Sequence, residues 1–208
     1  HLERARDAGR GCLLVTGHLG FFELGGLMIS RMGFPLTALT LPEPTDELTK
    51  WRADFRGRWG VGTIEVGPAS FGVVDIVREL RAGKFIAMLV DRPWDTNTVD
   101  VELPCGRTRF AAGPTLIALL AGCPMIPVAT VRRPDGGYRI VALGYVEPKW
   151  LPEGRDATIA HYTREVAAML VPEIVRYGDQ WFQFVPASAG GANDASGTGA
   201  SRETERNS

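Results

Sequence analysis

The feature that most constrains this chain is an alternation of short apolar runs with helix-like stretches. Residues 12–16 (CLLVT), 36–41 and 85–90 (FIAMLV) each have the length and composition of a buried strand. Helical patterns fill most of the intervals between such runs. Strands that alternate with helices in this way predict an α/β fold: a mixed, mostly parallel sheet with helices on both faces.

The remaining elements fit the same plan. Further strands are predicted at 63–66 and 99–103, and helices at 21–32, 46–58, 71–81, 114–121 and 157–176. Late in the chain, strands at 125–131 and 138–145 flank Arg133-Pro134-Asp135-Gly136-Gly137. Pro, Asp and two glycines between apolar runs are typical of a tight turn, which predicts an antiparallel hairpin.

The 208 residues are enough for one substantial domain, which we place at residues 1–186. Residues 187–208 are mostly Gly, Ala, Ser and Asn, and they lack the apolar content needed to offset chain ordering, so a disordered tail is predicted there. No apolar run approaches the roughly 20 residues that span a bilayer. The chain opens on His1 and not on Met, which indicates a fragment or a chain without its start, so any membrane anchor would have to lie upstream of it.

Charge and cysteine usage exclude several classes of function. The formal net charge is −1, which does not favour a nucleic-acid partner. Cys12, Cys105 and Cys123 are odd in number and far apart, without the spacing of a disulfide framework or a metal site. We therefore predict no bound metal, and a reducing, cytoplasmic-side environment.

The segment Thr16-Gly17-His18-Leu19-Gly20-Phe21-Phe22-Glu23 carries the sharpest chemical signal. It places a histidine just after a buried strand and a carboxylate at the start of the next helix. Strand ends are where ligands gather in open α/β sheets, and imidazole exchanges protons near neutral pH. For a lone histidine and glutamate at this spacing, a capping or surface histidine is the more common interpretation, and that alternative stays open on the residues alone.

Five further segments follow in a fixed order, and with this motif they resemble a known family. They are Arg56-Gly57-Arg58-Trp59-Gly60, residues 83–92 (GKFIAMLVDR), residues 103–109 (LPCGRTR), residues 113–127, and Asp179-Gln180-Trp181-Phe182. Together they cover roughly residues 11–186. The pattern resembles the lipid A biosynthesis acyltransferase family, the branch of the glycerolipid acyltransferase superfamily that contains lauroyl, myristoyl and phosphatidylinositol mannoside acyltransferases.

This resemblance implies a glycerol-3-phosphate acyltransferase-like fold and a direct acyl transfer. His18 would act as general base on a lipid hydroxyl, and Glu23 would orient its imidazole. Backbone amides from Gly17 to Gly20, or a nearby arginine, would stabilise the oxyanion. No cofactor is implied beyond the co-substrate, which is a fatty acyl thioester of acyl carrier protein or of coenzyme A.

The resemblance also implies the surroundings of the reaction. The acceptor would be a hydroxyl of a lipid A precursor or a related membrane glycolipid, and the protein would work peripherally at the cytoplasmic face of the bacterial inner (plasma) membrane. An apolar groove is needed for the fatty chain. Candidates to line it, all from the predicted helix after His18, are Phe21, Phe22, Leu24, Leu27 and Met28, although such a helix is more often plain core.

Charged residues in the other blocks are candidates for substrate binding. Arg56 and Arg58 are expected near the site, on acceptor phosphate or on the carrier's phosphopantetheine. Asp91 ends a buried strand, so it needs a partner, for which an arginine is expected, and Arg92 directly follows it. Arg107 and Arg109 flank Thr108 on a strand and face the same way, which suits phosphate binding. For each of these residues a solvated surface charge or a structural ion pair is the rival interpretation.

Two other functions remain possible on the sequence. A lipid esterase or other hydrolase would need a serine nucleophile beside His18, but no G-x-S-x-G elbow occurs, and Ser70 between Gly67 and Gly72 has the wrong spacing. A non-catalytic lipid-binding domain on the same fold is the second alternative. Dinucleotide binding is excluded because the glycines after Thr16 do not form the required fingerprint.

Overall fold

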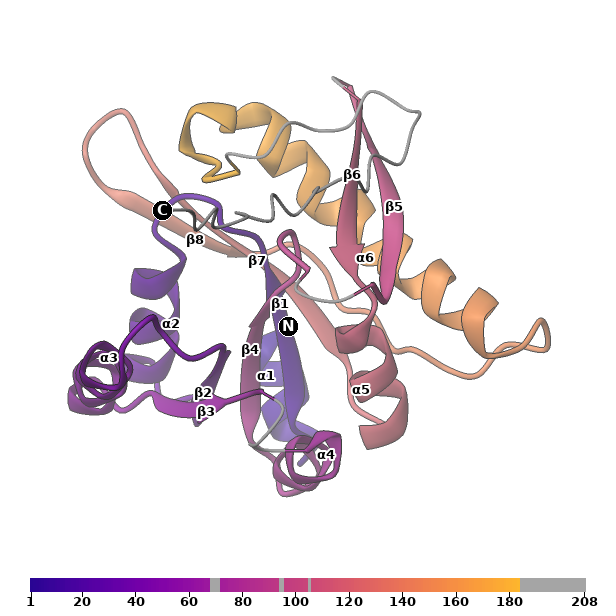
Figure 1. The fold of residues 1–208 in the computed structure, drawn as a ribbon, viewed down its shortest axis with the longest axis horizontal. Helices are drawn as coiled ribbons and strands as arrows, with labels where there is room; N and C mark the ends of the chain where they lie inside the picture. Colours follow the sequence, from indigo (N-terminus) through magenta and orange to yellow (C-terminus); the bar gives the residue numbers. More distant parts are fainter. Residues whose placement is uncertain (68–71, 94–95, 105, 184–208) are drawn as a thin grey trace, which may run out of the picture.

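The computed structural model describes residues 1–67, 72–93, 96–104 and 106–183. Its centre is a six-stranded sheet in the order β3-β2-β4-β1-β7-β8 (Figure 1). The strands are β1 (Cys12–Thr16), β2 (Leu36–Thr40), β3 (Gly62–Glu65), β4 (Phe85–Leu89), β7 (Met125–Arg132) and β8 (Tyr138–Ala142). All neighbours are parallel except β7 and β8, which form the predicted antiparallel hairpin.

Helices cover both faces of this sheet, as the alternation of elements predicted. The helices are α1 (Leu2–Asp7), α2 (Phe22–Arg31), α3 (Asp46–Arg58), α4 (Val73–Arg81), α5 (Gly113–Ala121) and α6 (Arg155–Arg176). Alternate residues of β1 enter different cores. Leu13 and Val15 pack with apolar residues of α4, α5 and α6, whereas Cys12 and Leu14 pack with those of α1 and α2. Burial on both faces explains why β1 is apolar throughout.

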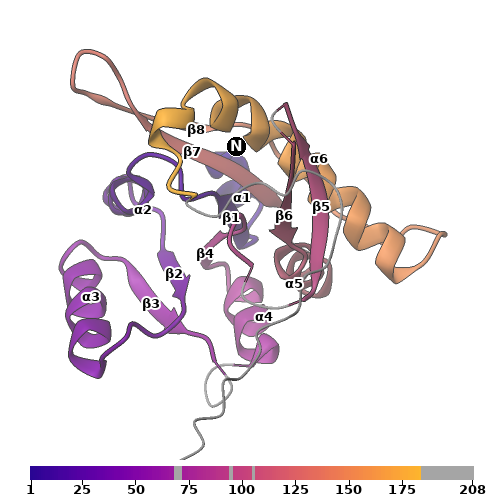
Figure 2. The same cartoon turned by 45° about the horizontal axis from the view of Figure 1, so that its top comes forward.

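A second, two-stranded sheet stands beside α6. It consists of β5 (Thr98–Leu103) and β6 (Gly106–Ala111), paired antiparallel from Thr98↔Ala111 to Leu103↔Gly106. Figure 2 shows this hairpin alongside α6, away from α2 and α3. Val101 and Phe110 of the hairpin are buried in the same core as the α6 residues Val166 and Leu170. The hairpin is therefore fixed to the domain by its inward face.

Most predicted elements are confirmed to within two residues at each end. The prediction carried the strand from residue 138 on to 145, whereas β8 ends at Ala142, and beyond it the chain pairs with β7 only at an isolated bridge between Val146 and Met125. Two elements had not been predicted as such. The first is α1, whose sequence LERARD buries only Ala5, so it has almost no apolar signal. The second is a 3-10 turn at Gly178–Gln180, which becomes important at the site.

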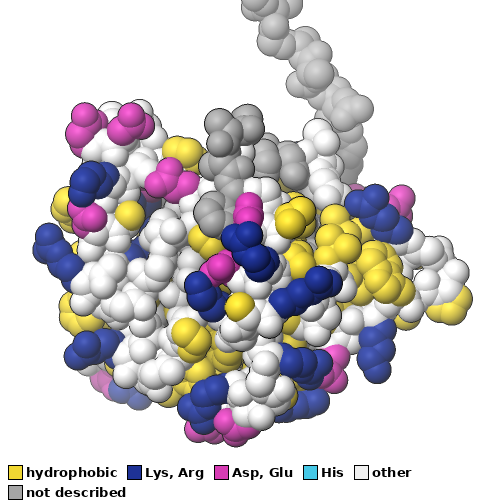
Figure 3. Space-filling view, turned by 90° about the horizontal axis from the view of Figure 1, so that it is seen from below, with side chains coloured by type: hydrophobic (Ala, Val, Ile, Leu, Met, Phe, Trp, Pro, Cys, Tyr) yellow, Lys and Arg dark blue, Asp and Glu magenta, His cyan; other side chains and the backbone are white. Residues whose placement is uncertain are grey.

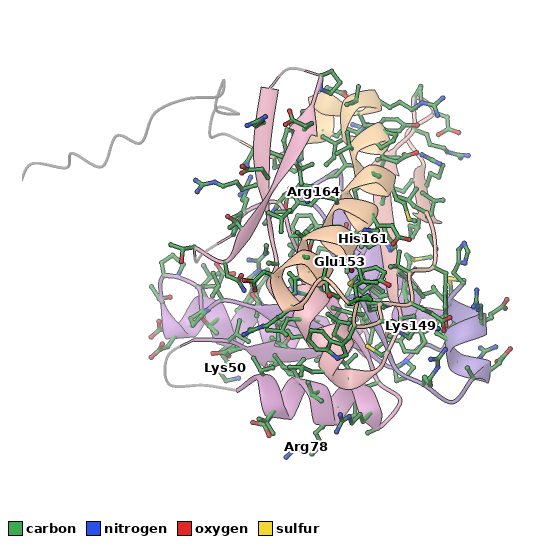
Figure 4. The ribbon with its side chains drawn as sticks, turned by 90° about the vertical axis from the view of Figure 1, so that its right-hand side faces the viewer. Lys50, Arg78, Lys149, Glu153, His161 and Arg164 are labelled. Atoms are coloured by element: carbon green, nitrogen blue, oxygen red, sulfur yellow. The ribbon has the colours of Figure 1, made fainter. Side chains whose placement is uncertain are left out.

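Surface features are ordinary for a globular domain. Arg, Lys, Asp and Glu side chains are interspersed on the face shown in Figure 3, without a continuous basic patch there. His161 lies on α6 (Figure 4), and its ring contacts that of Tyr162 at a centroid distance of 4.8 Å. Within the described ranges, no helix has both the length and the hydropathy to cross a membrane.

The cysteines, the predicted tail and the candidate metal ligands can be compared with the structure only in part. Cys12 and Cys123 are unpaired and buried, and burial raises the pKa of the Cys123 thiol to about 12, as expected of small core residues. Cys105 and the predicted tail at 187–208 lie outside the described residues. The described part of the chain holds no cluster of three or more His, Cys, Asp or Glu side chains able to bind a metal ion.

Candidate active site

His18 and Asp91 meet where two neighbouring parallel strands end. Strands β1 and β4 pair in register from Cys12↔Phe85 to Thr16↔Leu89, so the residues that follow them emerge at one edge of the sheet. The Nδ1 atom of His18 lies 2.8 Å from Oδ1 of Asp91. The backbone N–H of His18 also donates to Oδ2 of Asp91, at 2.8 Å. The carboxylate that holds His18 is thus Asp91, 73 residues away along the chain.

Asp91 is fully buried, and its charge is balanced by hydrogen bonds. Burial by itself would raise its pKa, but the His18 ring, the indole N–H of Trp181 and the His18 amide favour the charged form, and the net pKa is lowered. The Trp181 indole nitrogen is 2.8 Å from Oδ2. Asp91 is therefore an ionised hydrogen-bond acceptor at neutral pH.

This pairing fixes the protonation of the imidazole. An ionised carboxylate accepts hydrogen bonds and donates none, so the proton of neutral His18 lies on Nδ1 and the lone pair on Nε2. The His18 side chain is 22% exposed, and its ring meets the edge of Phe22 at a centroid distance of 5.3 Å. Such a histidine is arranged to accept a proton from a ligand and to share the resulting charge with Asp91.

Two glycines make this loop possible. A Cβ on Gly17 would lie 3.1 Å from Oδ2 of Asp91, which is tighter than ordinary contact. Gly20 has a φ of +59°, and a Cβ there would lie 2.0 Å from the carbonyl oxygen of Thr130. Gly20 thus needs to lack a side chain because the loop lies against β7, whereas a side chain at Gly17 would require Asp91 to shift by a few tenths of an ångström.

A cleft of about 1090 Å³ opens beside this loop. Its walls come from the start of α2, from α3, from the β7–β8 hairpin and from the chain after α6. Nearly half of its lining residues are aromatic, and most of the others are charged or polar: Gly20, Phe21, Phe22, Glu23, Trp51, Arg52, Phe55, Arg132, Arg133, Pro134, Tyr138, Tyr177, Asp179, Gln180 and Phe182. Phe21 and Phe22, two of the residues considered for an apolar groove, thus line this cleft, while a role in binding the fatty chain stays a prediction.

Comparison with known proteins agrees with this arrangement. The family described as bacterial lipid A biosynthesis acyltransferase matches residues 1–186, which is most of the chain. The chain belongs to this acyltransferase family. The match extends over every element described above, including the loop at His18, the strand that leads to Asp91 and the segment that carries Trp181.

Individual relatives in this family are more distant. The phosphatidylinositol mannoside acyltransferase of Mycolicibacterium smegmatis is 24% identical over 188 residues, which cover 89% of this chain and 59% of that protein. The protein of the same name from Mycobacterium tuberculosis is 24% identical over 129 residues, which cover 61% of this chain and 40% of that protein. The chain thus spans about half the length of the curated relatives it matches.

Glu23 does not take the role that the family motif suggested. Its carboxylate pairs with Arg56: Nε donates to Oε1 at 2.5 Å and Nη2 to Oε2 at 3.2 Å. The prediction that Glu23 orients His18 is therefore corrected, since Asp91 occupies the ring nitrogen. The physical reason is that α2 begins at Phe22, so Glu23 lies in its first turn and faces α3, where the 7% exposed Arg56 needs a counter-charge.

The predicted arginines do not gather at the cleft. Arg56 is bound to Glu23 and buried, so its expected contact with phosphate is not what the structure presents. Arg58 lies in the last turn of α3 and Arg92 follows Asp91, but neither lines the cleft. Arg107 and Arg109 do face the same way, outward from the β5–β6 hairpin, and Arg107 pairs with Glu102. That hairpin lies apart from the cleft lining.

The arginines of the cleft were not predicted. They are Arg52 on α3, and Arg132 and Arg133 at the end of β7. Arg52 pairs with Glu43, and Arg133 with Asp135, while the backbone of Arg132 is bonded to the amide group of Gln180. Nothing in the local sequence distinguishes these arginines from surface charges, because it is the packing of α3 opposite the β7–β8 hairpin that places them at one cavity.

The amide of Gly20 is also not available to an oxyanion, because it donates to the Gln180 carbonyl oxygen at 2.8 Å. The role of Gly20 is thus conformational, which corrects its assignment as an oxyanion donor. The amide of Gly17 stays a prediction. Ser70, the weak candidate for a hydrolase nucleophile, lies outside the described residues.

A small second pocket of about 60 Å³ lies under the Glu23–Arg56 pair, between α2 and the strands β2 and β4. Leu27 of the predicted groove residues lines it, together with Ala38, Leu39 and Met88. One water molecule takes about 30 Å³ in the liquid, so this space cannot hold a fatty chain as it stands. The larger cleft, at about 1090 Å³, is many times more spacious.

Proposed function

We propose that this chain is the catalytic domain of an O-acyltransferase that moves a fatty acyl group from a thioester to a hydroxyl of a membrane glycolipid. The observation that carries the proposal is the His18–Asp91 pair beside the aromatic cleft. Membership of the family and the names of the mycobacterial relatives support the same reaction class.

In this reaction Nε2 of His18 accepts the proton of the acceptor hydroxyl as its oxygen attacks the thioester carbonyl. The ester C–O bond forms, the C–S bond breaks, and the proton on the imidazolium passes to the departing thiolate. Asp91 stabilises the imidazolium while it exists. A general base of this kind contributes about 10²-fold to 10⁴-fold in rate. No covalent acyl-enzyme is required, because a thioester is already activated.

The cleft supports a sugar-bearing acceptor. Trp51 and Phe55 stack on each other at 5.8 Å on α3, and Phe21 and Tyr138 approach at 5.9 Å on the opposite wall. Exposed aromatic faces pack against the apolar C–H faces of sugar rings, and neighbouring arginines bond their hydroxyls or a linked phosphate. We therefore place the acceptor headgroup between these walls, with its reacting hydroxyl at His18.

The proposal also covers the acyl donor and the place in the cell where the reaction occurs. Acyl carrier protein and coenzyme A both present the acyl group as a thioester on phosphopantetheine, so either supplies the required chemistry. The acceptor is a membrane lipid, and the reaction would therefore take place where the domain rests peripherally on the cytoplasmic face of the plasma membrane.

The test is acyl transfer by the purified 208-residue chain in mixed micelles. Radiolabelled acyl-coenzyme A and acyl carrier protein are offered as donors, with a mannosylated phosphatidylinositol, a lipid A precursor and an unglycosylated phosphoglyceride as acceptors. We expect labelled glycolipid from the wild type, and a rate at least 10²-fold lower from His18→Ala.

The other two functions give different products in the same assay. Release of free fatty acid without labelled lipid indicates a hydrolase, and an unchanged rate in His18→Ala removes His18 from the chemistry. Binding of the lipid without turnover of any donor indicates a lipid-binding domain. His161→Ala makes the same substitution at an exposed residue of α6 that does not line the cleft, so it is the matched control and is expected to transfer at the wild-type rate.

A further inference from the structure

The six residues from Gly178 to Gln183 form a short strap that closes over the catalytic loop. They follow α6 and run antiparallel to the loop, with a bridge between Leu19 and Trp181. The Gly20 amide donates to the Gln180 carbonyl oxygen at 2.8 Å, and the Phe182 amide donates to the His18 carbonyl oxygen at 2.9 Å. Backbone hydrogen bonds thus hold the loop on both sides of Leu19.

Side chains of the strap reach the partner of His18. The Trp181 indole donates to Oδ2 of Asp91 at 2.8 Å, and the Gln183 amide donates to the Asp91 carbonyl oxygen at 3.1 Å. Gln180 anchors the strap itself. Its side-chain oxygen accepts from the Arg132 amide at 2.8 Å, and its NH₂ group donates to the Arg132 carbonyl at 3.0 Å, so it extends the edge of β7.

We propose that Trp181 and Gln180 are positioning residues for His18, acting through the Asp91 carboxylate and the backbone of the loop. This role rests on the proposed function for its catalytic consequence, but its structural part stands independently. A carboxylate attached by one rotatable bond can turn away from an imidazole. Here Oδ2 is held by both the His18 amide and the Trp181 indole, which leaves Oδ1 directed at Nδ1 of His18.

The strap's bonds therefore secure one tautomer of His18. With Oδ1 aimed at Nδ1, the Nδ1–H tautomer is favoured and Nε2 keeps its lone pair toward the acceptor. When the indole donor is lost, Oδ2 retains a single partner and the carboxylate can rotate. The fraction of the opposite tautomer then rises, and in that form Nε2 carries the proton and cannot act as a base.

The experiment compares the wild type with Trp181→Phe, which keeps an aromatic ring and removes the donor. The chain has three histidines, so ¹⁵N-histidine NMR resolves His18 after assignment with His18→Asn. The ¹⁵N shifts report which ring nitrogen is protonated. We expect a predominantly Nδ1–H tautomer in the wild type, and a measurable Nε2–H fraction in the variant.

In the transfer assay, kcat of Trp181→Phe is expected to fall about 10-fold to 100-fold, with KM within about twofold, since misorientation of a catalytic group affects the chemical step.

Trp150→Phe is the matched control, because it replaces the same residue type in the same way at a different place. Trp150 is 52% exposed and lies on the loop before α6. It is expected to leave both the ¹⁵N spectrum and kcat unchanged. Gln180→Met, which removes both bonds to Arg132, is a second variant that keeps the test decisive if Trp181→Phe does not fold.

An unchanged His18 tautomer in folded Trp181→Phe and Gln180→Met overturns the proposal, whatever their activity. A changed tautomer with wild-type kcat overturns its catalytic part. If the wild type transfers no acyl group but the tautomer still changes, positioning by the strap is supported and the proposed function is rejected. The two failures are thus distinguishable.

Discussion

His18–Asp91 and Glu23–Arg56 are two acid–base pairs whose first members stand five residues apart, yet the two regions do different things. In the first pair, Asp91 is fully buried while His18 keeps an exposed edge at the loop beside the cleft. In the second, the carboxylate uses both oxygens on the guanidinium of a buried arginine. The first pair leaves a ring nitrogen for chemistry. The second ties α2 to α3 and thereby fixes one wall of the cleft.

The comparison teaches that motif spacing does not identify which carboxylate contacts His18. The two carboxylates are chemically equivalent, and the nearer one in sequence is Glu23. Asp91 reaches His18 because β1 and β4 are adjacent parallel strands that end together. His18 and Asp91 each lie two residues beyond the end of a strand of the central sheet, and the paired strands hold both residues at one edge.

Replacing Asp91 should have the largest effect on activity. We expect Asp91→Asn to lower kcat by about 10²-fold to 10⁴-fold, because an amide cannot stabilise the imidazolium and permits the wrong tautomer. Glu23→Gln is the matched control and should lower kcat much less, since it alters a structural pair. Acyl transfer rates at saturating donor measure both. A larger loss in Glu23→Gln than in Asp91→Asn would reverse the roles assigned here.

Breaking the second pair should instead reduce stability. Arg56→Met leaves the Glu23 carboxylate partly buried without its partner, which costs about 3 to 5 kcal/mol of unfolding free energy. Urea denaturation followed by circular dichroism measures this cost. The double variant Glu23→Leu with Arg56→Met should recover much of the loss, because no uncompensated charge remains. If the single and double variants are equally unstable, the pair is not what holds α2 to α3.

The backbone of the catalytic loop offers a smaller test of the same comparison. We expect Gly20→Ala to cost about 2 kcal/mol or more of unfolding free energy. The left-handed conformation costs an L-residue about 1 to 2 kcal/mol, and the added Cβ would press on the Thr130 carbonyl. Gly136→Ala is the control: its φ is also positive, at +84°, but open space surrounds it. Equal losses in the two variants would mean that the contact with β7 is immaterial.

The smallest expected effect is that of Asp91 on how the unfolding free energy changes with pH. The pKa of Asp91 is lowered in the folded protein, so its contribution to stability is present above the unfolded value of about 4 and is lost as pH falls through the lower folded value. The unfolding free energy of the wild type should therefore decrease with falling pH more steeply than that of Asp91→Asn below about pH 4. Parallel curves for the two proteins would show that Asp91 is not held by its hydrogen bonds.

Much of the fold was predictable from local sequence. Runs such as residues 12–16 and 85–90 are too apolar for any place but a sheet buried on both faces, and the Pro-Asp-Gly-Gly turn specified the late hairpin. The short helix α1 was missed because it buries one residue. Of the site, His18 was found from its place after a buried strand, and Asp91 was recognised as a buried carboxylate in need of a partner, although the partner expected for it was an arginine.

The sequence by itself therefore determined the class of fold, the loop that carries His18 and the family to which the chain belongs. These follow from hydrophobic periodicity and from motifs read along the chain. The tertiary structure decided which carboxylate meets His18, which arginines face the cleft, and that Trp181 completes the site. Each of these depends on contacts between segments far apart in the chain, such as His18 with Asp91, Arg132 with Gln180 and Asp91 with Trp181, which are 48 to 90 residues apart. Such contacts depend on strand order and helix packing, which fix distances in space that spacing along the chain does not contain.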